Sequence, residues 1–155
     1  MVRAKVRHSP TRRDLLAGGA GLAAIVATGS ARGETDETQA AIRAFTGEAG
    51  VNRGRVKLDI PLLVESGNSV PVSVNVESPM TPTDFVKRIA LFTEKNPLPD
   101  VVQFHLGPRA GRASVATRVR LADSQTVTAV AELSDGSFWS HATDVIITLP
   151  ACAEG

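Results

Sequence analysis

The run Val70-Pro71-Val72-Ser73-Val74-Asn75-Val76 decides the fold class, because a valine at every second position places the valines on one face of an extended strand. The same alternation of apolar and polar residues occurs in four other segments, which are Val56 to Ile60, Val102 to Leu106, Val115 to Leu121 and Val127 to Leu133. Each segment therefore predicts a β-strand with one buried side and one solvent-facing side.

Turn-forming residues separate these strands at short intervals. Gly, Pro, Asn, Asp and Ser gather at residues 65–68, 78–82, 96–100, 107–111, 122–124 and 134–136. Segment 85–95 fits a helix as well as a strand, and we predict a strand; the apolar run 145–149 completes the set. About seven strands at this spacing indicate an all-β fold, an immunoglobulin-like antiparallel β-sandwich.

Pro71 modifies the prediction for its own strand. Proline cannot donate a backbone hydrogen bond to a neighbouring strand, so it occurs on edge strands or at irregular pairings. We therefore predict an edge or an irregular pairing at Pro71. Such an edge is a place where another chain could dock.

A short helix is predicted before the first strand. Residues 40–45 are rich in helix formers, Ile42 and Phe45 lie three positions apart, and Gly47 follows as a helix C-cap would. We expect this helix to run from about Asp36 to Thr46 and its narrow apolar side to cover one edge of the body.

The N-terminal segment has the pattern of an export signal. Arg12 and Arg13 form a twin-arginine pair, a weakly apolar Gly/Ala-rich run extends from Leu15 to Ala27, and small residues follow at 29–31. We therefore expect residues 1–33 to be a twin-arginine signal that is removed on export. The run is too short and too rich in glycine for a transmembrane anchor, so the processed protein is expected to have no membrane attachment.

Removing this segment reverses the charge balance. Residues 1–33 hold six of the 17 Lys and Arg and one of the 16 Asp and Glu, which leaves 11 basic and 15 acidic residues. The net charge of +1 for the whole chain becomes −4 for residues 34–155. No basic stripe with interleaved aromatics remains, so a nucleic-acid partner is not expected. Residues 34–149 suffice for one domain with a modest core.

The predicted domain contains no recognisable catalytic motif. His105 and His141 are far apart, without cysteine or acidic residues at metal-ligand spacing, and each is read as a structural or surface histidine. No nucleophile elbow, phosphate-binding loop or zinc-protease motif occurs. Trp139, the only tryptophan, is more typical of a core residue than of a partner contact. The sequence therefore predicts a scaffold without catalytic residues, metal or cofactor of its own.

The only cysteine, Cys152, lies three residues from the C-terminus. If a strand ends at Leu149, an extended chain places the thiol roughly 10 Å beyond the folded body. We therefore expect residues 150–155 to form a mobile C-terminal arm that presents a thiol. An unpaired cysteine in an exported protein suggests a reactive or intermolecularly paired thiol, and the alternative is a chance cysteine on a frayed end.

Several linked motifs resemble a known family over about residues 36 to 149. The motifs are Gly67-Asn68-Ser69-Val70-Pro71-Val72, Ser78-Pro79-Met80-Thr81, Glu94-Lys95-Asn96-Pro97, Ser114 to Leu121, Ser124-Gln125-Thr126-Val127 and Asp135-Gly136-Ser137-Phe138-Trp139. They resemble SoxY, the sulfur-carrier subunit of the periplasmic thiosulfate-oxidising (Sox) system.

The resemblance implies a periplasmic carrier protein rather than an enzyme, with Cys152 as the covalent attachment site. It also implies a heterodimer with SoxZ, a second immunoglobulin-like protein. The partner enzymes that it implies are a c-type haem enzyme that conjugates thiosulfate to the cysteine, a hydrolase that releases sulfate and a sulfane dehydrogenase.

The tail departs from the family pattern, which is Gly-Gly-Cys-Gly-Gly or close to it. Here Pro150 and Ala151 precede Cys152, and Ala153 and Glu154 follow it. Proline fixes φ and alanine adds bulk, whereas glycine would allow unusual backbone angles in a narrow cavity. Glu154 disfavours the thiolate and repels an anionic cargo. An alternative function is therefore a SoxY-like interaction module that binds a SoxZ-like partner but has lost the carrier function.

Overall fold

The computed structural model describes the backbone of residues 30–149 and the side chains of residues 36–149. One α-helix, nine strands and a 3₁₀ turn follow one another in this part of the chain. They are α1 (Ser30–Thr46), β1 (Val51–Arg53), β2 (Val56–Asp59), β3 (Leu63–Ser66), β4 (Val70–Val76), β5 (Val86–Thr93), β6 (Asp100–His105), η1 (Pro108–Ala110), β7 (Ser114–Val119), β8 (Gln125–Leu133) and β9 (Phe138–Leu149). No helix in these residues is long and apolar enough to cross a membrane.

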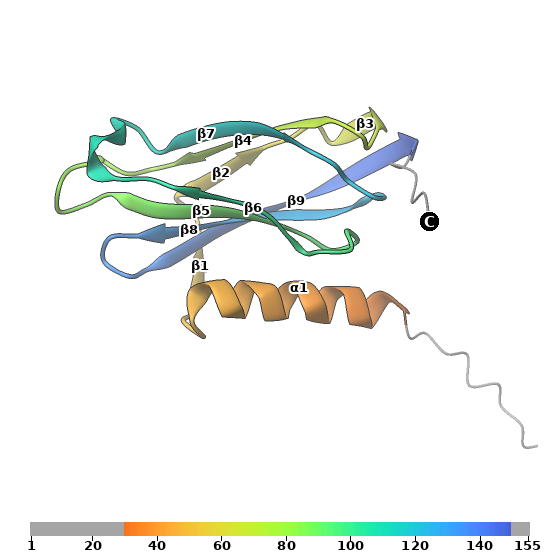
Figure 1. The fold of residues 1–155 in the computed structure, drawn as a ribbon, viewed down its shortest axis with the longest axis horizontal. Helices are drawn as coiled ribbons and strands as arrows, with labels where there is room; N and C mark the ends of the chain where they lie inside the picture. The colour runs from red at the N-terminus through yellow and green to blue at the C-terminus, as the bar shows by residue number, and fades with distance from the viewer. Residues whose placement is uncertain (1–29, 150–155) are drawn as a thin grey trace, which may run out of the picture.

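The strands form two packed sheets, as expected for an all-β sandwich. The larger sheet has the order β1-β9-β8-β5-β6, with β3 also paired to β9, and the smaller sheet has the order β2-β4-β7. Figure 1 shows the smaller sheet as the upper layer and most of the larger sheet beneath it. The predicted strand in segment 85–95 is confirmed as β5.

The core between the sheets is built from the alternating residues of the sequence. In β4 every valine is buried while Pro71 and Asn75 are exposed, so the strand has one apolar and one polar face. The core is completed by side chains of the facing sheet, among them Ile89, Leu91, Val127 and Val145. The alternation of apolar and polar residues along the strands therefore determines which faces of the two sheets pack together.

A second apolar cluster lies on the opposite face of the larger sheet, under α1. Ile42 and Phe45 of the helix pack on residues of three strands, which are Ala90 and Phe92 of β5, Val130 of β8 and Phe138 of β9. The Phe45 ring lies edge-on to those of Phe92 and Phe138, with centroids 5.8 and 6.0 Å apart. The prediction that the helix covers one edge of the body is therefore wrong, because α1 covers a sheet face (Figure 1).

The helix ends where the sequence predicted but begins earlier. It extends from Ser30 to Thr46, and Gly47 follows with φ +62°, the left-handed conformation of a helix C-cap. The start at Ser30 lies before the predicted signal boundary at residue 33. The side chains that attach the helix to the sheet, Ile42 and Phe45, lie well inside the predicted mature chain.

Pro71 lies in the middle strand of the smaller sheet rather than in an edge strand, and the other predicted possibility, an irregular pairing, is confirmed. Strand β4 pairs with β7 along its length, but its pairing with β2 ends at Asp59↔Ser73. At Pro71 the strand therefore has a neighbour on one side only, which is where a missing backbone N–H is tolerated.

Two short strands, β1 and β3, were not predicted. Both pair with β9 in parallel, with Val51↔Phe138 near its beginning and Leu63↔Ile146 near its end. All residues of β1 are exposed, and β3 includes Glu65 and Ser66 from a predicted turn. Strand β1 buries neither face, and β3 half-buries only Val64 and Ser66 on one face, so neither shows the apolar and polar alternation by which the other strands were recognised.

Candidate functional site

The predicted site residue Cys152, the arm 150–155 and the signal residues Arg12 and Arg13 all lie outside the described residues. The structure describes the end of β9 at Leu149, which precedes the predicted arm. Figure 1 shows β9 rising from the lower layer toward β3 as it approaches this end. The geometry of the site is therefore that of the base of the arm.

Strand β3 holds one side of this base through hydrogen bonds. The Ile146 N–H donates to the Leu62 carbonyl at 2.8 Å, and the Gly67 N–H donates to the Leu149 carbonyl at 3.0 Å. The Thr148 hydroxyl adds a bond to the Glu65 carbonyl at 3.1 Å. The end of β9 is therefore paired up to its last residue.

The loop between β7 and β8 holds the other side. The Ile147 N–H donates to the Ser124 hydroxyl at 2.8 Å, and the Leu121 N–H donates to the Gly67 carbonyl at 2.8 Å. Asn96 joins this network, because its side chain bonds the Arg120 carbonyl at 2.8 Å and the Ala122 N–H at 2.9 Å. Residue 150 consequently follows a strand end that is fixed on both sides.

The two histidines of the domain lie apart. His105 is exposed at the end of β6. His141 is also exposed on β9, but its Nδ1 accepts a hydrogen bond from the Leu58 N–H of β2 at 3.0 Å, which links the two sheets. Within residues 36–149 no group of three or more His, Cys, Asp or Glu could hold a metal ion.

Trp139 is half-buried and packs against the main core. Its Nε1 donates to the Ser137 hydroxyl at 3.0 Å, and the Arg55 guanidinium lies 5.4 Å from the ring centroid. Gly54 lies against the same ring, since a Cβ there would be 3.7 Å from it. The tryptophan thus closes the corner around residues 54–55 as part of the core, as the sequence predicted.

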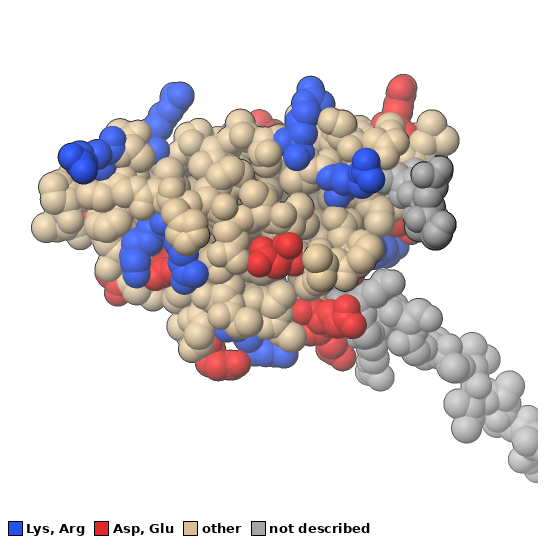
Figure 2. Space-filling model, in the orientation of Figure 1, with Lys and Arg blue, Asp and Glu red and all other residues tan. Residues whose placement is uncertain are grey.

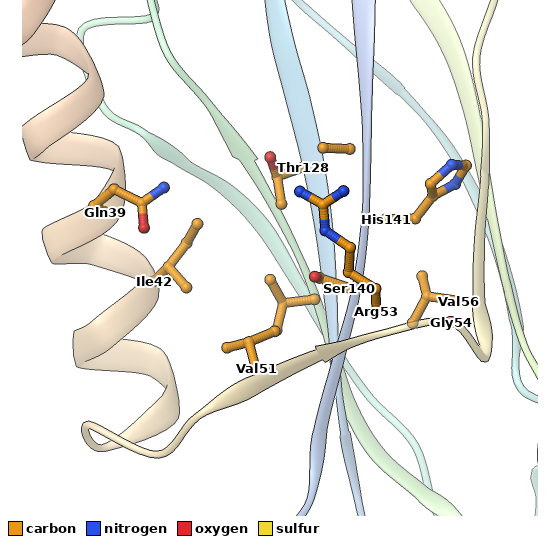
Figure 3. Close-up of a pocket in the computed structure, with 11 residues that line it drawn as sticks. Gln39, Ile42, Val51, Arg53, Gly54, Val56, Thr128, Ser140 and His141 are labelled. Atoms are coloured by element: carbon orange, nitrogen blue, oxygen red, sulfur yellow. The ribbon is translucent and has the colours of Figure 1, made fainter.

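A hollow of about 640 Å³ lies between α1, β1 and the beginning of β9 (Figure 3). Arg53 extends into it toward Thr128, and its other polar residues include Gln39 and Ser140. The sequence did not indicate this hollow, because it forms only where α1 and β1 cross the sheet. It lies beside residues 140–142 of β9, roughly 20 Å from Leu149, and three arm residues span only roughly 10 Å.

Glu132 is the buried carboxylate of the larger sheet, with 8% of its side chain exposed. It receives hydrogen bonds from Lys87 Nζ and Arg88 Nε, each at 2.5 Å. Burial opposes its ionisation, but the hydrogen bonds and charges of Lys87 and Arg88 together outweigh burial and lower the pKa of Glu132. The Arg88 guanidinium also lies 4.4 Å from the Phe45 centroid, so this group attaches α1 to the sheet.

Charges on the displayed face are mixed. Figure 2 shows positive and negative side chains scattered among broad uncharged areas. No continuous basic surface is visible on this face, in agreement with the charge balance of the sequence.

The fold and the site together define a class, the immunoglobulin-like β-sandwiches that carry a cysteine just beyond their last strand. The family model described as sulfur oxidation protein SoxY matches residues 42–152, and its match ends at Cys152. The chain belongs to the SoxY family.

One similar solved structure is a SoxY protein, and others share the fold. The sulfur carrier protein SoxY from Chlorobium limicola f thiosulfatophilum is 25% identical, with a TM-score of 0.63 over 74% of this chain and 99% of that one. The superoxide reductase (neelaredoxin) from Ignicoccus hospitalis is 17% identical, with a TM-score of 0.54 over 61% of this chain and 80% of that one. This second likeness concerns the fold alone. No curated protein matches the sequence.

Proposed function

We propose that the protein is a periplasmic sulfur carrier that holds thiosulfate-derived intermediates covalently on Cys152. The observation that carries the proposal is the SoxY match over residues 42–152, which includes the cysteine itself. The similar Chlorobium protein, described as a sulfur carrier, supports it.

The proposed loading step joins two sulfur atoms by oxidation. The Cys152 thiol and thiosulfate form Cys–S–S–SO₃⁻ with loss of one proton and two electrons, and a c-type haem enzyme accepts the electrons. A hydrolase then adds water and releases sulfate, which leaves a persulfide, Cys–S–S⁻, and two protons. A sulfane dehydrogenase then oxidises the outer sulfur with three water molecules to Cys–S–SO₃⁻, releasing six protons and passing six electrons to its electron acceptor. The hydrolase cleaves this product with one water molecule into sulfate, a proton and the free thiol. The reactive groups other than the thiol belong to the partner enzymes, so the carrier needs no active site.

A thiol near a chain end suits this work. The thiolate is the nucleophile in sulfur exchange, and a terminal position lets several enzymes reach it. Attachment to the carrier keeps the intermediate at a high effective concentration between successive enzymes. Because Pro150 and Ala151 replace glycine and Glu154 adds negative charge, we expect partner enzymes with wider and more basic entrances than a Gly-Gly-Cys-Gly-Gly tail requires.

The remaining parts of the chain serve export and assembly in this proposal. Residues 1–33, with Arg12 and Arg13, direct export by the twin-arginine pathway and are removed, residues 34–149 form the domain, and residues 150–155 form the carrier arm. A SoxZ-like subunit completes the protein as a heterodimer.

The altered tail favours a second candidate. Pro150 and Glu154 are unfavourable to loading, so the chain could be an interaction module that binds a SoxZ-like subunit without carrying sulfur.

Substitution of the cysteine separates the two functions. The gene is replaced by a Cys152→Ser variant, and the sulfate that the cells form from thiosulfate is measured. We expect sulfate formation to be lost, because serine cannot form the disulfide bond to thiosulfate. An Ala153→Ser variant, which keeps the thiol, is the matched control and is expected to retain activity. Normal sulfate formation by Cys152→Ser refutes the carrier function and leaves the interaction module.

A further inference from the structure

Large exposed apolar side chains gather at the arm end of the molecule. Residues 36–149 have six of them. Five lie in β3, directly before it, at the end of β9 or in the loop after β5, namely Leu62, Leu63, Leu98, Ile146 and Leu149, with 59% to 75% of each exposed. The sixth, Val51, pairs with Phe138 at the other end of β9 and is the least exposed at 36%.

Hydrogen bonds place these five residues at one end of the sandwich. Leu63 pairs directly with Ile146, and Leu149 accepts a bond from Gly67. The Gly67 carbonyl in turn binds the Leu121 N–H, and Asn96 binds both chain neighbours of Leu121. Leu98 follows Asn96 by two residues. Strands β5 and β9 are both antiparallel to β8, so both end on the same side (Figure 1). We call these five residues the arm-base surface.

The paired strands β3 and β9 expose apolar side chains on both faces. Leu63 and Ile146 lie side by side on one face, whereas the alternation of strand residues places Leu62 and Leu149 on the other. Among the described strands, β3 has a neighbour on one side only. Exposed apolar side chains grouped in this way are typical of a surface that another protein covers.

The length of the arm indicates which protein covers it. Cys152 follows Leu149 by three residues, so the thiol reaches roughly 10 Å from the end of β9. An enzyme that takes the thiol into a recessed active site must therefore bring the rim of that site onto the strand ends around Leu149. The residues that meet this rim are those of the arm-base surface.

We propose that the arm-base surface is the docking surface for the enzymes that load and unload Cys152, and that an apolar outer rim surrounds the more basic entrance of each active site. The proposal rests on the carrier function proposed above. The arm delivers the thiol, and the leucines and isoleucine at its base give each enzyme a common apolar contact that holds the arm in the entrance. Apolar contact suits successive partners, because it does not require each to match a fixed pattern of charges.

Two variants test this surface. A Leu63→Ser/Ile146→Ser double variant removes the central apolar pair, and Val51→Ser is the matched control at the opposite end of β9. Each full-length gene replaces the native one in cells, thiosulfate is added after starvation, and the sulfur-loaded fraction of Cys152 is followed by intact mass spectrometry. We expect the initial loading rate of the double variant to fall at least about tenfold, and that of Val51→Ser to stay as in the native protein.

Three further measurements on the purified proteins show whether slower loading comes from weaker docking or from another cause. Circular dichroism reports folding, the rate with a small aromatic disulfide reagent reports the thiol itself, and size-exclusion chromatography reports assembly with the second subunit. The proposal requires all three to remain at native values while enzyme-dependent loading falls. If the double variant unfolds, the milder Leu63→Gln variant is subjected to the same loading assay.

The outcomes distinguish this proposal from the carrier function. Native loading of a folded double variant overturns the docking surface and leaves the carrier function intact. If the double variant no longer assembles with the second subunit, the surface is the permanent subunit interface. If the native chain forms a homodimer and the double variant does not, the surface binds a second copy of this chain. Either result overturns the proposal. If Cys152 of the native protein never carries sulfur, the carrier function itself fails.

Discussion

The carboxylate of Glu132 gives the most specific prediction for a single residue. A Glu132→Gln variant removes the negative charge between Lys87 and Arg88 and is expected to lower the free energy of unfolding by about 1–3 kcal/mol at pH 7. Both cations are partly exposed, so water can solvate them in the variant, and the loss stays below that of a fully buried pair. Urea unfolding measures the difference.

The same variant has a defined pH dependence. Because the folded-state pKa of Glu132 is lowered, its stabilisation is complete above the ordinary value of 4.5 and is lost as the pH falls through the folded-state pKa. The difference between native protein and variant should therefore shrink when unfolding is measured in acid. Glu77→Gln, an exposed carboxylate without an ion pair in the described residues, is the control. A difference that does not change with pH contradicts the assigned role.

Of the two residues Cys152 and Glu132, only the first could be singled out from the sequence alone. Cys152 could be singled out from sequence because it is the only cysteine and lies beyond the last apolar run. Glu132 could not, since its partners come from a neighbouring strand 44 and 45 positions away and are brought together only by the register of β5 and β8.

The helix α1 gives the main prediction for a single element. Phe45→Ala removes the ring that packs on Phe92 and Phe138, and we expect the free energy of unfolding to fall by about 3 kcal/mol. Arg43→Ala, at an exposed position of the same helix, should change it by less than about 0.5 kcal/mol. Urea unfolding of both variants provides the comparison. Equal stabilities would mean that α1 does not hold the outer face of the larger sheet.

The elements that sequence predicted most clearly are those with one buried face. Alternation identified β4 and its neighbours, and the terminating glycine located the end of α1. Strand β5 was ambiguous because α1 covers one of its faces and the sandwich core the other, so its apolar residues do not alternate. The short parallel strands β1 and β3 depend on the distant strand β9 and carry no local signal.

Export is a property of the whole molecule and can be tested at Arg12 and Arg13. We expect an Arg12→Lys/Arg13→Lys variant to remain inside the cell as the uncleaved precursor, because the signal is recognised through its arginine pair. Cell fractionation and mass spectrometry of the N-terminal peptide measure location and cleavage. An Arg3→Lys/Arg7→Lys variant conserves the same charge outside the pair and should be exported normally. Mature periplasmic protein from the first variant at native levels contradicts the proposed route.

At the scale of the whole molecule, sequence predicted the sandwich but not the apolar surface at its end, and the position of the thiol stays a prediction. Leu62 and Leu63 lie more than 80 positions from Ile146, and only the parallel pairing of β3 with β9 brings them to the base of the arm. Leu98 joins them through the bonds of Asn96. A docking surface of this kind is made by topology, so composition and periodicity could not reveal it.

The most direct test of the central claim is the intact mass of the native protein from cells growing on thiosulfate, measured before and after reduction. The account predicts an added mass on Cys152 that matches a thiosulfonate or sulfane sulfur and that disappears on reduction. A free Cys152 thiol throughout active thiosulfate oxidation contradicts the carrier function.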